Sequence, residues 1–167
     1  MPKVLNADDL KPKPTFDVLA ISLSETGLLK WSTKNETGSL PYIIETFKWN
    51  KWIPVAEVNG IGSPDQHDYE FQLSLHSGNN KIRVKQKGTK NITRYSGEVT
   101  SNSTVKKPSY VMNKDNSVSF SQETAYEVYD AYGIIVKKGF GKSLKMDNLK
   151  KGVYYLCYDN EVSEVKR

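Results

Sequence analysis

The residues of this chain that could carry chemistry are few and widely spaced. Its only two histidines, His67 and His76, flank one strand-like segment, and its single cysteine is Cys157. One thiol cannot form an intrachain disulfide, and it excludes the cysteine-rich zinc motifs. The sequence contains no Gly-x-Ser-x-Gly motif, and its carboxylates are scattered. We therefore expect no catalytic residue, no metal site and no cofactor, and we interpret the protein as a non-enzyme.

The sequence GFGKS at residues 139–143 has the Gly-Lys-Ser ending of a phosphate-binding loop. That motif also requires a glycine five residues before Gly141, where this chain has Val136. The stretch lies between two strand-like segments, so no helix N-terminus is expected to face a phosphate. We predict a hairpin turn here and no nucleotide binding.

Aromatic residues are stronger candidates for a binding role. Trp31 alternates with Leu29 in a strand-like segment, which predicts that it lies in a sandwich core. Trp49 and Trp52 flank an expected hairpin tip, where exposed indoles, together with nearby Tyr42, could contact a ligand such as a sugar ring. The alternative, which we favour, is that the two indoles cover the sheet edge and contact the neighbouring domain.

Composition and charge narrow the class of protein. The 167 residues are 37% apolar and 11% aromatic, with ten tyrosines, which is typical of a globular chain rich in β structure. The net charge of +5 is spread along the chain, so it permits an acidic polysaccharide partner without requiring one, and we expect no nucleic-acid partner. We find no apolar run long enough to span a membrane, and no signal peptide at the start. The early KPKP sequence favours a trimmed fragment of an exported chain over a cytosolic protein.

The hydrophobic pattern has a period of two residues almost throughout, which indicates half-buried strands. In the segment HDYEFQLSLH, for example, Tyr69, Phe71, Leu73 and Leu75 are expected to point the same way. Seven short strands separated by turn-rich stretches predict an immunoglobulin-like or fibronectin type III-like sandwich in the first half. The expected strands are residues 16–23, 28–33, 42–47, 53–58, 68–76, 81–86 and 92–100.

The domain organisation follows from these strands. We expect a disordered or linker segment over residues 1–15 and a β-sandwich over 16–101. The polar sequence TSNSTVKKPS suggests an interdomain linker over 102–109. A second, smaller antiparallel sandwich should follow over 110–167, so the chain is predicted to be all-β, with two sandwiches in tandem.

The second half resembles the C-terminal sorting domain of type IX secretion substrates. In that family, a strand ends in Tyr-Asp and is followed by two residues, a glycine and an apolar strand. Farther on, the family has a leucine, and then Gly-x-Tyr at the start of another strand. It closes on a basic strand, and it usually opens with a Pro-Asn-Pro element, where this chain has VMNKDN. The matching positions here are Tyr129, Asp130, Gly133, residues 134–136, Leu149, Gly152, Tyr154, Lys166 and Arg167.

The first half resembles fibronectin type III-like modules that often precede these sorting domains. LLKWSTKNETG is similar to their Leu-x-Trp strand and glutamate-containing loop. KIRVKQKG is similar to their Tyr-Arg-Leu-Lys-Gln strand, with Ile82 where the family often has an aromatic residue.

The resemblance implies export across the outer membrane of a Gram-negative bacterium, with release or anchoring at the cell surface. The implied partner is the secretion machinery of the outer membrane, and the residues expected to be recognised are Gly152, Tyr154, Lys166 and Arg167. The first domain would serve as a spacer or interaction module, and the chain is expected to be a monomer. The alternative function is a carbohydrate-binding or adhesin-type module that uses Trp49, Trp52 and Tyr42.

Overall fold

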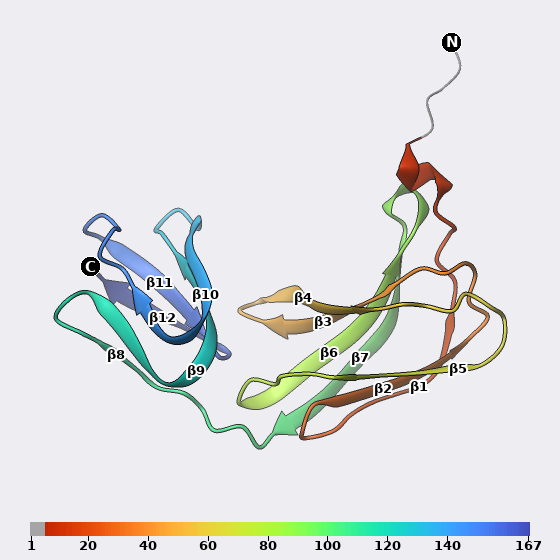
Figure 1. The fold of residues 1–167 in the computed structure, drawn as a ribbon, viewed down its shortest axis with the longest axis horizontal. Helices are drawn as coiled ribbons and strands as arrows, with labels where there is room; N and C mark the ends of the chain where they lie inside the picture. The colour runs from red at the N-terminus through yellow and green to blue at the C-terminus, as the bar shows by residue number, and fades with distance from the viewer. Residues whose placement is uncertain (1–5) are drawn as a thin grey trace, which may run out of the picture. The chain divides into compact units, whose positions relative to one another are not determined.

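The computed structural model describes residues 6–167, which divide into two compact units. The first unit runs to Leu75 and resumes over Asn79–Ser103, and the second comprises His76–Gly78 and Thr104–Arg167. Both units consist of antiparallel strands (Figure 1). The predicted all-β fold class, two small antiparallel β-sandwiches in tandem, is therefore confirmed.

Seven strands form the two sheets of the first unit. One sheet has the order β1-β2-β5 and the other has the order β4-β3-β6-β7, which is the strand arrangement of a fibronectin type III-like sandwich. A short 3₁₀ turn, Thr89–Asn91, joins the last two strands. The strands are β1 (Asp17–Leu23), β2 (Leu28–Lys34), β3 (Tyr42–Lys48), β4 (Lys51–Val58), β5 (His67–Gln72), β6 (Gly78–Lys87) and β7 (Thr93–Ser103).

Strict alternation of side chains gives this unit its core. In β6, Ile82 and Val84 are buried, while the residues between them are only half-buried and face outward. Trp31 is 1% exposed and stacks on Tyr69, with ring centroids 5.2 Å apart, so its predicted core position is confirmed. The buried core consists of Phe16, Leu29, Trp31, Tyr42, Ile44, Tyr69, Leu73, Ile82 and Val84.

All seven predicted strands are present, and the largest difference is at the end of β5. The alternation predicted a strand to residue 76, but β5 ends at Gln72. Beyond it, the Leu73 amide donates to the carbonyl of Gly27 in the turn between β1 and β2. Leu73 stays in the core, so the apolar pattern continues although the pairing with β2 has stopped.

The segment before β1 is held on the first unit where the structure describes it. Residues 1–5 of the predicted disordered or linker segment lie outside the described residues. Ala7–Leu10 forms a 3₁₀ turn, and Pro14 is buried. The carbonyl of Pro12 accepts a hydrogen bond from the Thr89 amide, and that of Thr15 accepts one from the Thr37 amide. Residues 12–15 are therefore attached to the first unit through these two carbonyls.

The second unit is built on one folded sheet. The sheet has the order β10-β9-β11-β12, and β8 pairs with the first part of β9. β9 is long and curved (Figure 1), and residues from both of its ends, Val118 and Val128, lie in one core. The strands are β8 (Tyr110–Met112), β9 (Ser117–Tyr129), β10 (Ile135–Lys145), β11 (Val153–Tyr158) and β12 (Glu161–Lys166). The core consists of Val118, Phe120, Val128, Leu144, Met146, Tyr154, Leu156, Tyr158 and Val165.

The GFGKS sequence lies inside β10 and not in a hairpin turn, so that prediction was wrong. A Cβ atom at Gly139 would come within 2.5 Å of the Tyr126 hydroxyl, so glycine lets that ring approach closely, and a larger residue would have to displace it. The register with β9 shifts between Gly141 and Ser143, where β10 advances by two residues while β9 advances by five, from Ser119 to Thr124, so the extra residues lie in β9. Gly139 therefore serves strand packing.

The predicted linker over residues 102–109 is largely part of the two units. β7 continues to Ser103. Farther on, the Ser109 amide donates to the Ser121 hydroxyl, and the Ser121 amide donates to the Ser109 carbonyl. The Lys106 carbonyl accepts from the Gln122 side chain, so residues 106–109 lie along β9.

Candidate functional site

A buried carboxylate lies at one end of the first sandwich. Glu36 follows β2 and is 4% exposed. Its Oε1 atom accepts hydrogen bonds from the hydroxyls of Thr33 at 2.5 Å, Tyr69 at 2.8 Å and Tyr42 at 2.9 Å. Its Oε2 atom accepts from the Gly62 amide at 2.8 Å. The carboxylate therefore joins β2, β3, β5 and the loop between β4 and β5.

The hydrogen bonds determine the ionisation of this cluster. Burial raises the pKa of Glu36, but the hydrogen bonds from Thr33, Gly62, Tyr69 and Tyr42 lower it, and the net pKa lies below the ordinary value. Burial and the adjacent carboxylate raise the pKa of Tyr69 to about 12 and raise the pKa of Tyr42 further. Glu36 is thus a charged acceptor held by neutral donors, an arrangement that fixes the loop in place.

Tyr42 was predicted as a possible ligand contact, and the structure contradicts this. Its side chain is fully buried, packs edge-on against Phe16 and Trp31, and donates its hydroxyl to Glu36. The strand alternation places Tyr42 on the inner face of β3 together with Ile44, so no sugar can reach the ring in this fold.

Trp49 and Trp52 lie where the sequence suggested, in and beside the turn between β3 and β4. Trp49 and Asn50 form the turn with φ of 52° and 64°. The Lys48 ammonium lies 4.2 Å from the centre of the Trp49 ring. Trp52 packs against Phe47, with ring centroids 5.2 Å apart, on the outer face of the four-stranded sheet. Both indoles are half-buried.

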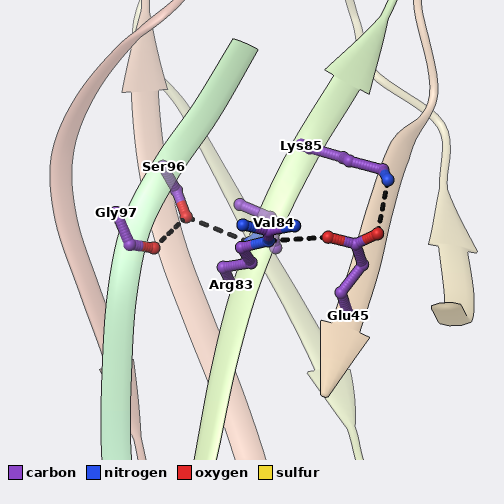
Figure 2. Close-up of polar contacts among 6 residues, drawn as sticks. All are labelled: Glu45, Arg83, Val84, Lys85, Ser96 and Gly97. Carbon is purple, nitrogen blue, oxygen red and sulfur yellow. Dashed lines mark hydrogen bonds and ion pairs between the residues drawn. The ribbon is translucent and has the colours of Figure 1, made fainter. Parts of the chain in front are cut away.

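Glu45, Arg83 and Lys85 form a charged cluster on the same outer face (Figure 2). Glu45 of β3 has only 3% of its side chain exposed, and it pairs with two cations of β6. Its Oε2 atom accepts from Arg83 Nε at 2.6 Å, and its Oε1 atom accepts from Lys85 Nζ. Glu45 lies directly opposite Arg83 in the strand register, so one carboxylate reaches both cations.

The Arg83 guanidinium lies between two aromatic rings. Its Cζ atom is 4.1 Å from the centre of the Trp52 ring and 4.2 Å from the centre of the Tyr95 ring. Such contacts hold a planar cation in one orientation. Sequence reasoning missed Arg83, Glu45 and Tyr95, although the alternation within KIRVKQK would have placed Arg83 on the outer face.

The neighbouring strand, β7, contains a glycine in the left-handed conformation. Gly97 has φ of 86°, and the Ser96 hydroxyl beside it accepts a hydrogen bond from the Val84 amide at 3.0 Å while donating to the Gly97 carbonyl at 2.7 Å (Figure 2). The Ser96 side chain thus supplies the acceptor for the Val84 amide, and Tyr95 of β7 lies beside Arg83 of β6.

The four predicted recognition residues of the second unit lie near the open edge of its sheet. Gly152 and Arg167 exchange two backbone hydrogen bonds of 3.0 Å just beyond β11 and β12. Tyr154 is 8% exposed, and its hydroxyl donates to the Lys150 carbonyl. Lys166 is exposed, whereas Arg167 is half-buried and donates to the Asp147 carbonyl. Of the two cations, Lys166 is therefore the accessible one.

Gly152 does not have the left-handed backbone conformation for which a turn usually needs glycine. Its φ is not in the left-handed region, and a Cβ atom there would meet nothing within 4 Å. Gly133, by contrast, has φ of 78° in the turn after β9, where Asp130 Oδ1 accepts from the amides of Tyr132 and Ile134. The fold therefore favours glycine at 133 and tolerates another residue at 152.

Residues 6–167 contain no group of three or more histidine, cysteine, aspartate or glutamate side chains placed to hold a metal ion. Within the same residues, no helix has the length and apolar character needed to cross a membrane.

Comparisons with known proteins give similarity only to solved structures. No protein-family model matches the chain, and no curated protein matches it. The FN1-FN3 domains of chicken CNTN1 match at 12% identity and a TM-score of 0.31, over 92% of this chain and 64% of that chain. The BSP domain of a biofilm associated protein matches at 14% and 0.29, over 94% and 29%. The fibronectin(III)-like modules of Clostridium thermocellum CbhA match at 10% and 0.28, over 91% of each chain.

The chain thus spans less than two thirds of the first two of these structures. The identities and TM-scores are low, and we assign the fibronectin type III-like fold of the first unit from its strand order and core alone.

Proposed function

We propose that this chain is a non-enzymatic part of an exported bacterial protein that is secreted or held at the cell surface. In this proposal, the second unit is a sorting signal read by the type IX secretion machinery of the outer membrane. The first unit is a spacer or interaction module. The resemblance of residues 108–167 to the sorting family motivates the assignment.

The observation that carries the proposal is the open edge formed by β12. The second unit has its own apolar core, and β12 is the last strand of its sheet. Val162, Glu164 and Lys166 of β12 are exposed. An open strand edge can pair with a strand of another protein, and a lysine on it disfavours pairing with a second copy. A receptor could therefore recognise both the backbone and the charge.

The test fuses a secreted reporter to the start of the whole chain in a cell with a working type IX system. We expect the reporter to reach the medium or the cell surface, and to remain in the periplasm when the secretion system is deleted. Equal export with and without that system, or retention of the unaltered fusion in the periplasm, would refute the proposal.

Glycine variants separate recognition from folding. Because a Cβ at Gly152 meets open space, Gly152→Ala should leave thermal stability unchanged, and any loss of export then reports recognition at this position. Gly133→Ala is the matched control, because it should lower stability through its positive φ. Lys166→Gln tests the exposed charge in the same assay.

Carbohydrate binding by the first unit is the second candidate function. Tyr42 cannot contribute, because it lies in the core. The observation that favours this candidate is the Arg83 guanidinium, which lies between Trp52 and a second aromatic ring on an outer sheet face.

A further inference from the structure

A row of cations runs along the outer face of β6. Every second residue of this strand is basic, at Lys81, Arg83, Lys85 and Lys87, while the residues between them are buried. Alternate residues of a strand are roughly 6.8 Å apart, so the charges form a line along the sheet. A linear array of this kind is complementary to an extended polyanion and not to a compact one.

Within this row, the Arg83 side chain is held in place by its neighbours. Its Nε atom donates to Glu45, while its Nη atoms donate to no acceptor within the described residues. Its side chain is 19% exposed. A guanidinium that keeps its terminal donors and is already held by neighbours loses little entropy when it binds a planar carboxylate through two parallel hydrogen bonds.

Glu45 orients the Arg83 guanidinium, but its single negative charge does not neutralise the row of cations on β6. It is one buried carboxylate shared by Arg83 and Lys85. Lys81 is 3.4 Å from Glu98, but both side chains are well exposed, so that ion pair is weak and open to exchange. Excess positive charge therefore remains on this face.

We propose that the outer face of β3, β6 and β7 binds a polysaccharide of carboxylated sugars, with Arg83 as the carboxylate-binding fork. Lys81, Lys85 and Lys87 supply further positive charge along the polymer. The exposed Tyr95, beside Arg83, offers an apolar surface to the sugar ring. This inference rests on the second candidate function, carbohydrate binding by the first unit, and does not depend on the sorting role of the second unit.

Single-stranded nucleic acid fits the same face less well. Its bases stack on a succession of free aromatic faces. Here Arg83 covers one face of both Trp52 and Tyr95, and Phe47 packs against Trp52 as well. The contacts left to a ligand are the fork, the lysines and the uncovered part of Tyr95, which suit repeated carboxylates better than bases.

Binding of the full chain to polygalacturonate at low salt tests the proposal, with neutral dextran and an oligothymidylate as comparison ligands. We expect measurable binding to polygalacturonate that weakens as salt rises, and no binding to dextran. Tighter binding to oligothymidylate than to polygalacturonate would assign the face to nucleic acid and overturn the proposal. Absence of polygalacturonate binding, or equal binding to dextran, would also overturn it.

Two matched pairs of variants locate the site. Arg83→Lys keeps the charge but removes the planar fork, so we expect the dissociation constant to rise about tenfold. Arg94→Lys makes the same change away from the row, at a residue that bonds the Phe16 carbonyl, and should change binding less than twofold. Lys87→Gln should weaken binding more than Lys30→Gln on the other sheet. Equal effects within either pair would contradict the assignment.

One more variant covers the case in which Arg83→Lys disturbs folding. Tyr95→Leu keeps an apolar residue but removes one of the two rings that hold the guanidinium. We expect weaker binding with an unchanged melting temperature, because Tyr95 is 48% exposed. Unchanged binding by a folded Tyr95→Leu protein would argue against a preorganised fork.

Discussion

Replacing Glu36 by glutamine is the sharpest test of how the first unit is held together. The carboxylate accepts three hydroxyl donors on Oε1 and the Gly62 amide on Oε2. An amide has one acceptor oxygen, so its NH₂ group must face either the Gly62 amide or the three hydroxyls. In either orientation, at least one buried donor loses its acceptor, and the remaining hydrogen bonds lose the negative charge.

The expected magnitude follows from these hydrogen bonds. A stranded buried donor costs about 1–3 kcal/mol, and a hydrogen bond to a charged group contributes roughly twice as much as a neutral one. We expect Glu36→Gln to lower the free energy of unfolding of the first unit by about 2–4 kcal/mol at pH 7, a large part of the total for a small domain. The exposed Glu70→Gln is the control and should change it by less than about 0.5 kcal/mol.

Guanidinium unfolding followed by tryptophan fluorescence measures this difference. The chain has three tryptophans, Trp31, Trp49 and Trp52, and all of them lie in the first unit, so the signal reports that unit alone. The intensity of Trp31 should change most, because it leaves its stack on Tyr69.

The pH dependence provides an independent check. The pKa of Glu36 is lowered in the folded state, so its contribution is fully present above the unfolded value of about 4.3 and is lost as the pH falls through the folded pKa. The difference between the natural protein and Glu36→Gln should therefore shrink in acid. A difference below about 0.5 kcal/mol at pH 7, or one that stays constant between about pH 7 and 3, would refute this account of the cluster.

Three further predictions concern other parts of the chain. The stability of the first unit should fall as the pH rises from about 10, because tyrosines of the unfolded chain ionise there while folding raises the pKa of Tyr69 to about 12. A spectrophotometric titration of tyrosinate should show a late-ionising fraction, and this fraction should be smaller in Tyr69→Phe. Ser96→Ala leaves the buried Val84 amide without its acceptor and should cost about 1–2 kcal/mol in chemical unfolding, and an unchanged midpoint would contradict this role of the Ser96 hydroxyl. Gly133→Ala should lower the stability of the second unit by about 1–2 kcal/mol, whereas Gly152→Ala should not, and calorimetry would expose the reverse order.

The strands could be predicted because burial alternates along them. Trp31 lies in the core as the pattern indicated. The pattern failed where pairing ends without a change in hydrophobicity, as at Leu73, whose amide turns to Gly27 while its side chain stays buried. It also failed at Gly139, because a glycine that makes room for the Tyr126 ring cannot be told from a turn glycine in one sequence.

The candidate sites depend on partners that are distant in sequence. Tyr42 and Glu36 are six residues apart, but Tyr69, which completes the cluster, becomes their neighbour only when β5 pairs with β2. Arg83 of β6 reaches Trp52 of β4 across β3, so this contact exists only once the three strands are paired in that order. No local spacing encodes such contacts, so composition and periodicity cannot reveal them.

The two faces of β6 can therefore be altered separately. Ile82 and Val84 point into the core, and truncating either would create a cavity and destabilise the sandwich. Lys81 and Lys87 point outward. Lys81 makes an exposed ion pair with Glu98 and lies over the Phe47 ring, so replacing either lysine should change the surface charge with little effect on folding. Arg83 lies between these cases, since it holds the buried charge of Glu45. A loss of ligand binding at the outer lysines without a change in stability would therefore be evidence for a surface function of this strand.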